Sequence, residues 1–232
     1  MIVVVNGLMK MTLLDFPGRV ACTVFTAGCN MRCPFCHNAA LVTEIDPSER
    51  INEGELFDFL KKRVGLLDGV AITGGEPLLH QDLSDFIREV RALGYAIKID
   101  TNGSFPERLE ALVAEGLIDY VAMDIKNAPE LYSRTVGVEG FDISPVERSK
   151  DFLLSGAVDC EFRTTVVAQF HTVESITGAA KWIAGAKRYF LQQFTDSGNL
   201  ISDGLTAASK DIMEEMCEAA REFVPATQLR GI

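Results

Sequence analysis

Three of the six cysteines of this chain, Cys29, Cys33 and Cys36, lie within eight consecutive positions and have the spacing C-x3-C-x2-C. Such a cluster predicts metal ligation, because independent core thiols do not need to lie so close together in sequence. A structural zinc site takes four protein ligands, and iron–sulfur clusters are normally held by four cysteines. Three cysteines on a cluster of four irons leave one iron with an open coordination position, where chemistry can take place. A zinc knuckle and a disulfide framework are the alternatives.

The composition restricts the compartment and the partners. The 232 residues carry a formal net charge of −11, which argues against nucleic acid or an anionic membrane as partner, because clustered Lys and Arg bind phosphate groups. No apolar run approaches the roughly 20 residues of a membrane-spanning helix, and the first residues lack the basic region of a signal peptide. Clustered cysteines fit a reducing compartment, so we expect a cytoplasmic protein. The remaining cysteines, Cys22, Cys160 and Cys217, lack ligand spacing and are predicted to be buried apolar residues.

Apolar runs typical of strands alternate along the chain with segments of helical periodicity. The predicted strands cover residues 20–25, 69–73, 96–99, 120–123, 160–167 and 189–194, with a final short strand at 228–231. Asn52 and Glu55 form a predicted capping box that opens a helix, and helical periodicity predicts a last long helix over residues 206–224. Short connections between alternating strands and helices indicate a parallel sheet covered by helices. A doubly wound sheet is the competing closure, but no G-x-G-x-x-G follows the first buried strand. We therefore expect an α/β fold, a partial, open (β/α)6 TIM-like barrel. It forms a single domain over residues 1–232, with an N-terminal extension at 1–19 and a cysteine loop at 28–38.

Polar motifs follow the predicted strands at their carboxyl ends. Gly74-Gly75-Glu76-Pro77 follows the second strand, Asp100-Thr101-Asn102-Gly103 the third, and Asp124-Ile125-Lys126 the fourth. Taken singly, each is compatible with an ordinary turn or a surface ion pair. In a barrel of parallel strands, however, the strand ends meet on one face, where such folds keep their sites. Glycines there let a ligand approach the backbone, and charged groups there would be partly desolvated and therefore paired.

The cysteine spacing, with the aromatic Phe35 directly before Cys36, resembles the radical SAM superfamily. The resemblance implies that the three cysteines hold a [4Fe-4S] cluster and that S-adenosylmethionine chelates the open iron through its amino and carboxylate groups. It further implies that an electron from the cluster cleaves the sulfonium, which gives methionine and a 5′-deoxyadenosyl radical. The open partial barrel is also the fold that this family implies.

The resemblance extends to the strand ends. The Gly-Gly-Glu-Pro segment matches the one that holds the methionyl amino group in this family, and glycyl radical activating enzymes carry similar D-T-N-G and D-x-K segments. By this resemblance Lys126 binds the carboxylate or ribose side of the cofactor, while Asp100 and Asp124 orient it, with a monovalent cation as an optional further ligand. The implied cofactor-binding residues are Phe35, Cys36, His37, Gly74, Gly75, Glu76, Asp100, Asn102, Asp124, Lys126, Arg163 and His171.

Segments along nearly the whole chain look like those of the anaerobic ribonucleoside-triphosphate reductase activating proteins. They are residues 13–18, 29–38, 189–194 and 229–231. This resemblance implies a radical SAM oxidoreductase that abstracts hydrogen from one glycine of a large partner enzyme, with an external electron donor such as flavodoxin or ferredoxin. The glycine loop of the partner is expected to enter an open side of the barrel near Asp15 and Arg19.

Three alternatives stay open. The first is the activation of another glycyl radical enzyme, since the C-H-N after the last cluster cysteine is shared with pyruvate formate-lyase activating enzymes. The second is a radical SAM enzyme with a small-molecule substrate, such as a 7-carboxy-7-deazaguanine synthase. The third is a non-catalytic iron–sulfur electron-transfer protein, which would not need the cofactor motifs at the other strand ends.

Overall fold

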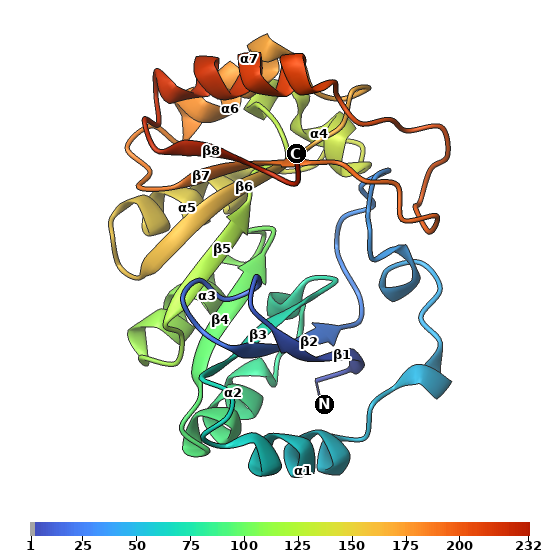
Figure 1. The fold of residues 1–232 in the computed structure, drawn as a ribbon, viewed down its shortest axis with the longest axis vertical. Helices are drawn as coiled ribbons and strands as arrows, with labels where there is room; N and C mark the ends of the chain where they lie inside the picture. The colour runs from blue at the N-terminus through green and yellow to red at the C-terminus, as the bar shows by residue number, and fades with distance from the viewer. Residues whose placement is uncertain (1–2) are drawn as a thin grey trace. The chain divides into compact units, whose positions relative to one another are not determined.

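The structure is a computed structural model that describes residues 3–232, so residues 1 and 2 of the predicted N-terminal extension lie outside the described part. The strands are β1 (Val5–Thr12), β2 (Ala21–Thr26), β3 (Gly69–Gly74), β4 (Ala96–Thr101), β5 (Tyr120–Asp124), β6 (Asp159–Val166), β7 (Tyr189–Gln193) and β8 (Thr227–Arg230). The helices are α1 (Glu53–Arg63), α2 (Leu83–Ala92), α3 (Pro106–Ala114), α4 (Tyr132–Val136), α5 (Ser144–Leu154), α6 (Val173–Trp182) and α7 (Lys210–Arg221). Figure 1 shows the course of the chain through them.

The eight strands form one sheet in chain order, from β1 to β8. β1 pairs antiparallel with β2, whereas β2–β3, β3–β4, β6–β7 and β7–β8 pair in parallel. Among residues 3–232, β1 and β8 are the two edge strands, so the sheet is not closed. These findings confirm the predicted α/β fold of the open, barrel-like class.

The predicted elements agree with the structure except at their ends and in short segments. The short helix α4 was not predicted, and α7 begins at Lys210, whereas the periodicity placed its start near residue 206. The reason for the later start is a cap, because the Ser209 hydroxyl accepts a hydrogen bond from the N–H of Ile212. Asn52 caps α1 as predicted, and its side chain accepts hydrogen bonds from the N–H groups of Gly54 and Glu55.

The contacts divide the chain into two compact units. The first comprises the described residues up to Asn30, Ala40–Thr101 and Phe105–Val121, and the second comprises Met31–Ala39, Asn102–Ser104 and Ala122–Ile232. The first unit is built on β1 to β4, whose central strand β3 contains a fully buried run, Val70 to Ile72. Helices α1 and α2 contact each other within it through the T-shaped ring pair of Phe57 and Phe86.

The second unit is built on β6, β7 and β8, with α6 and α7 packed together over one face of these strands (Figure 1). Successive side chains of a strand point to opposite faces. The fully buried set, Phe162, Thr164, Val166, Tyr189 and Leu191, therefore faces the helices. The other set forms what we call the polar face of β6–β8: Glu161, Arg163, Thr165, Phe190, Gln192, Gln228 and Arg230.

Candidate functional site

The cysteine segment directly follows β2 and is anchored through its backbone. The N–H of Arg32 donates to the carbonyl of Val136 at 2.9 Å, and the N–H of Cys36 donates to the carbonyl of Cys33 at 3.0 Å. Gly137, which ends α4, has a φ of 67°, and a Cβ there would lie 2.2 Å from the Arg32 carbonyl oxygen. Only glycine fits so close to the segment, so the end of α4 helps to fix the loop that carries the cysteines.

The thiols differ in exposure. Cys29 and Cys36 are half-buried and Cys33 is buried; Cys29 belongs to the first unit and the other two to the second. Within residues 3–232 no disulfide joins the six cysteines, and no three His, Cys, Asp or Glu side chains are grouped as ready metal ligands. The ligand role of the three cysteines therefore stays a prediction.

The cysteines outside the segment are buried, as predicted. Burial raises the pKa of Cys22 to about 12 and that of Cys160 to about 11. Burial also raises the pKa of Cys217. These three thiols are therefore protonated, apolar members of the core, because a thiolate is disfavoured there.

The Gly74-Gly75-Glu76-Pro77 segment packs tightly against the backbone that leads to Cys29. A Cβ on Gly75 would lie 1.9 Å from the carbonyl oxygen of Gly28. The N–H of Gly75 donates to the carbonyl of Thr26, and the N–H of Glu76 donates to the carbonyl of Gly28, both at 2.8 Å. The sequence suggested that backbone N–H groups here face a ligand, but these two instead fasten the motif to the end of β2.

Glu76 itself is fully buried. Its Oε1 accepts hydrogen bonds from the N–H of Leu78 at 3.0 Å and from the hydroxyl of Thr101 at 2.8 Å. This carboxylate therefore joins the turn after β3 to the last residue of β4. Its predicted contact with the cofactor amino group is not tested by these bonds and stays a prediction.

The end of β4 carries a charged pair, of which the sequence analysis predicted Asp100 but not Lys98. The ammonium group of Lys98, which is 1% exposed, contacts the carboxylate of Asp100 two residues further along the same face. Beyond the strand, Asn102 accepts a hydrogen bond from the N–H of Ser104 at 2.9 Å. The buried Ser104 hydroxyl has no hydrogen-bond partner among residues 3–232, which is a costly state unless a polar group reaches it.

Asp124, Lys126 and Arg163 form a cluster between the carboxyl end of β5 and the middle of β6. The Lys126 Nζ lies 2.9 Å from Asp124 Oδ2, and the Arg163 Nη2 lies 3.0 Å from Asp124 Oδ1. Burial alone would raise the pKa of Asp124, but the two cations outweigh burial and hold the pKa at about 2. Two cations and one carboxylate leave the cluster with a net charge of +1, which suits an anionic group of a ligand.

His171 and Phe35 are buried behind this cluster. The N–H of Val167 donates to His171 Nδ1 at 3.0 Å, so the proton is assigned to Nε2, which donates to the carbonyl of Lys126 at 2.9 Å. Burial lowers the pKa of His171, which keeps the ring neutral. The Phe35 ring packs 5.6 Å from Phe170 and 6.2 Å from His171. Both side chains thus support the Lys126 backbone and the cysteine segment, and their direct contact with a cofactor stays a prediction.

Other predicted residues lie in two places. The exposed His37 stacks on Phe194 with ring centroids 5.5 Å apart. In the first unit, Asp15 Oδ2 accepts a hydrogen bond from the Thr23 hydroxyl at 2.5 Å, and the Arg19 guanidinium lies 5.3 Å from the Phe16 ring. Beside them the loop exposes apolar side chains, of which Leu14 is 89% exposed.

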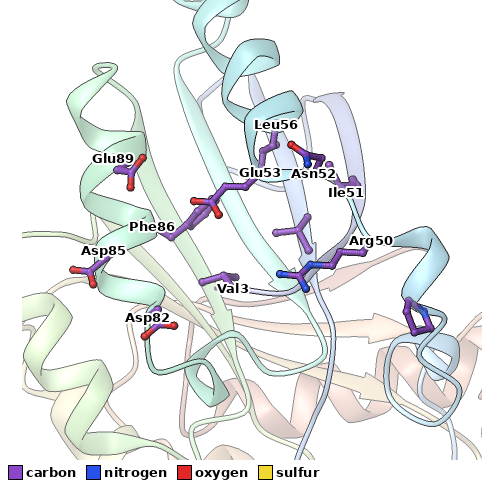
Figure 2. A pocket seen from close by; sticks show the side chains of 12 residues that line it. Val3, Arg50, Ile51, Asn52, Glu53, Leu56, Asp82, Asp85, Phe86 and Glu89 are labelled. Atoms are coloured by element: carbon purple, nitrogen blue, oxygen red, sulfur yellow. The ribbon is translucent and has the colours of Figure 1, made fainter. Parts of the chain in front are cut away.

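A pocket of roughly 750 Å³ in the first unit lies elsewhere and contains none of the predicted site residues. Figure 2 shows Arg50 on one side of it and three carboxylates of the α2 region, Asp82, Asp85 and Glu89, on another. Val3 and Phe86 supply apolar parts of the lining. We assign this pocket no role in binding the cluster or S-adenosylmethionine.

Sequence reasoning missed two buried charges, Lys98 and Glu161. Each lies within an apolar strand two residues before a charged residue that was named, Asp100 and Arg163 respectively. The signal was this i, i+2 spacing, because residues two apart in a strand share a face. Charged residues at that spacing in a buried strand indicate an ion pair or a polar cavity.

The residues present fit the two groups that the sequence pattern implies. The segment 29–36 offers three thiols on an anchored backbone. The cluster around Asp124 offers a net positive charge, and the Ser104 hydroxyl is a buried polar group without a partner among the described residues. Thiolates suit an iron–sulfur cluster, and a cationic pocket suits the carboxylate of an amino acid.

The chain belongs to the radical SAM superfamily, whose family model matches residues 23–146. Membership implies a [4Fe-4S] cluster and S-adenosylmethionine as the cofactors of an enzyme with radical chemistry. A protein of Methanocaldococcus jannaschii, provisionally named a glycyl-radical enzyme activating enzyme, is 31% identical over 98% of this chain and 96% of its own length. In residues 3–232 no helix is long and apolar enough to cross a membrane.

Further relatives match over shorter stretches. A pyruvate formate-lyase-activating enzyme of Listeria monocytogenes is 33% identical over 53% of this chain and 52% of its own length. A 7-carboxy-7-deazaguanine synthase of Hyperthermus butylicus is 34% identical over 39% of this chain and 38% of its own. Among solved structures, SuiB of Streptococcus suis bound to S-adenosylmethionine has a TM-score of 0.68 at 14% identity, over 88% of this chain and 48% of its own. That structural likeness concerns the fold alone.

Proposed function

We propose that this protein generates a glycyl radical on a partner enzyme and that the partner is an anaerobic ribonucleoside-triphosphate reductase. The observation that carries the proposal is the similarity over nearly the full length to a relative named for glycyl radical activation. When bound, the cluster and S-adenosylmethionine supply a 5′-deoxyadenosyl radical, which takes one hydrogen atom from the target glycine. The choice of reductase rests on residues 13–18, 189–194 and 229–231, which resemble the activators of that enzyme.

The residues of the chain have distinct tasks in this proposal. Cys29, Cys33 and Cys36 hold the cluster and leave one iron open for the cofactor. Lys126 binds the cofactor carboxylate or ribose side, and Asp124 fixes its ammonium group at 2.9 Å. His171 holds the backbone of Lys126 through its Nε2 proton. A single fixed cation is useful here because it places the cofactor without mobile water around the charge.

The proposal assigns the other named groups to the cofactor by their resemblance to the family motifs. Gly74, Gly75 and Glu76 bind its amino group, and Asp100 with Asn102 orients it from the end of β4. Phe35, Cys36 and His37 line it from the cysteine segment, and Arg163 does so from β6. Asp100 and Asp124 orient the cofactor through a monovalent cation that their carboxylates bind. Flavodoxin or ferredoxin supplies the electron.

The exposed loop after β1 is the place where we expect the partner to dock. Asp15 is held by Thr23, while Leu14 and Arg19 project outward. Exposed apolar side chains next to charged ones are common at protein interfaces. Because Asp15 also fixes the turn, Leu14→Ser is the sharper probe: it should weaken activation of the partner and spare cofactor cleavage, and equal loss of both would count against this docking site.

The central experiment is anaerobic. The protein is reconstituted with iron and sulfide, reduced with dithionite and mixed with S-adenosylmethionine, with and without the anaerobic reductase of the same organism. We expect 5′-deoxyadenosine and, with the reductase, a doublet signal of a glycyl radical in electron paramagnetic resonance. Cys33→Ala should abolish both, whereas Cys217→Ala, which removes a core thiol, should retain both. A fully loaded cluster that does not cleave the cofactor would refute the proposal.

The second candidate is a radical SAM enzyme with a small-molecule substrate, favoured by the similarity to a 7-carboxy-7-deazaguanine synthase. Cofactor cleavage without any protein radical in the same experiment would support it. An electron-transfer protein would show a reducible cluster and no cleavage.

A further inference from the structure

The polar face of β6–β8 carries side chains whose hydrogen-bonding groups the described residues do not use. Thr165 of β6 lies opposite Gln192 of β7, and Gln192 lies opposite Arg230 of β8, so the three form one row across the strands. Thr165 and Gln192 are half-buried, and neither side chain makes a hydrogen bond within residues 3–232. Half-buried polar groups bond either to water or to a bound ligand, so these two are available to a ligand.

The side chain of Arg230 points away from Thr165 and Gln192, toward Glu161. Its two terminal nitrogens lie 2.8 Å and 3.1 Å from the two carboxylate oxygens of Glu161, near the amino end of β6. On the way its guanidinium covers the ring of Phe190, 3.3 Å from the ring centroid. Because Arg230 is paired with Glu161, the Thr165 hydroxyl and the Gln192 amide are the polar groups of this row that can bind a ligand.

The chemistry of the face indicates a neutral ligand with both donors and acceptors. Glu161 and Arg230 neutralise each other, so the row of Thr165, Gln192 and Arg230 offers no free charge to a ligand. A hydroxyl and a carboxamide each donate and accept, which matches the N–H and C=O groups of a peptide. An anionic ligand would instead call for an unpaired cation at this level.

The row also lies close to the cysteine segment, where a substrate of radical chemistry has to be held. Two residues beyond Gln192, on the same face of the chain, Phe194 stacks on His37, which directly follows the predicted cluster ligand Cys36. Two strand residues span about 7 Å. On the other side of the row, β8 is a four-residue edge strand with an exposed Gln228, so an extended chain can reach the polar face of β6–β8 across it.

We propose that the Thr165 hydroxyl and the Gln192 amide bind main-chain amide groups of the extended, glycine-bearing segment of the protein substrate, which lies on the polar face of β6–β8. The assignment rests on the proposed function and names the residues that recognise its substrate. A glycine fits this reading because a residue without a side chain lets its backbone approach a sheet face closely. Glu161 acts as a positioning residue, since it holds the Arg230 side chain away from the Thr165 hydroxyl and the Gln192 amide.

The test compares variants in the complete activation reaction with the anaerobic reductase as substrate. Thr165→Val and Gln192→Leu remove the hydrogen-bonding groups at nearly constant size. Each should raise the KM for the reductase about three- to tenfold, the effect of one lost hydrogen bond, and should lower the number of glycyl radicals formed per 5′-deoxyadenosine. Thr165→Ser keeps the hydroxyl and should retain the wild-type KM, and Gln81→Leu, at an exposed glutamine of the first unit, should change neither quantity.

The outcomes separate this inference from the proposed function. If the wild type forms the glycyl radical and Thr165→Val and Gln192→Leu have its KM and coupling ratio, the inference is wrong and the function stands. If Thr165→Ser is as impaired as Thr165→Val, the hydroxyl is not the group that matters and the inference is likewise overturned. If the wild type cleaves the cofactor but forms no glycyl radical on the reductase, the proposed function fails, and this assignment fails with it. Urea unfolding of each variant identifies a fold defect, and Gln192→Glu then serves as the conservative second variant, expected to show the same raised KM.

Discussion

Replacing Arg230 by methionine tests the buried ion pair of β6 and β8 in isolation. Methionine keeps an apolar stem over Phe190 but removes both hydrogen bonds to Glu161, at 2.8 Å and 3.1 Å. Glu161 is 2% exposed, so water cannot readily replace the lost partner. The variant therefore measures the cost of a buried carboxylate deprived of the guanidinium that faces it.

The magnitude follows from the burial of the pair. Removing one partner of a buried ion pair typically costs about 3 to 5 kcal/mol. The Glu161 side chain is 2% exposed but that of Arg230 is 35% exposed, so the lower end of this range applies. We expect Arg230→Met to lower the free energy of unfolding by about 3 kcal/mol.

The assay is urea unfolding at pH 7, followed by circular dichroism. Arg88→Met is the matched control, because Arg88 pairs with the exposed Asp85 and Glu115, and such surface pairs contribute less than about 1 kcal/mol. The double variant Glu161→Gln/Arg230→Met should be more stable at pH 7 than Arg230→Met, since glutamine carries no charge. A loss below about 0.5 kcal/mol, or a double variant that is no more stable than Arg230→Met, would refute the reasoning.

Three further predictions concern the first unit and the histidine. Gly75→Ala should cost about 3 kcal/mol or more in urea unfolding, because its Cβ would lie 1.9 Å from the Gly28 carbonyl oxygen; a cost near that of an ordinary Gly→Ala change would contradict the close packing. The lowered pKa of His171 means that the unfolded chain binds its proton more readily, so stability is present above about pH 6.5 and is lost as the pH falls below it. His171→Asn should therefore lose less stability than the wild type between pH 7 and pH 5.5, and parallel curves would count against the assignment. Lys98→Met should destabilise by about 3 kcal/mol, with part of the loss recovered in a double variant with Asp100→Asn; no recovery would show that the two groups are not coupled.

The fold was predictable because its signals are local. Buried β-branched runs mark the strands, and Asn52 marks the start of α1 through its side-chain cap. The start of α7 was placed too early because Ser209 is a cap that periodicity does not reveal. α4 has five residues, fewer than two turns, which is too short for a periodic pattern.

The candidate site was predictable as a set of residues but not as a set of bonds. Asp124, Lys126 and Arg163 were each named from motifs, yet their pairing depends on how β5 and β6 bring them together. The use of the Gly75 N–H by the end of β2 depends likewise on tertiary packing. The spacing of Glu161 and Arg163 indicates a shared face, but it does not reveal the partner of Glu161, because Arg230 lies 69 positions later in the chain.

The burial of three of the six thiols has a practical consequence for loading the protein with iron. Protonated thiols inside the core cannot compete for the metal or form mixed disulfides during oxidation. During reconstitution we therefore expect no reaction at Cys22, Cys160 and Cys217. An alkylating reagent given to the native protein without its cluster should modify the segment 29–36 first and reach the other three cysteines only after denaturation. Peptide mass mapping of that labelling order would give a cluster-occupancy assay that needs neither spectroscopy nor turnover.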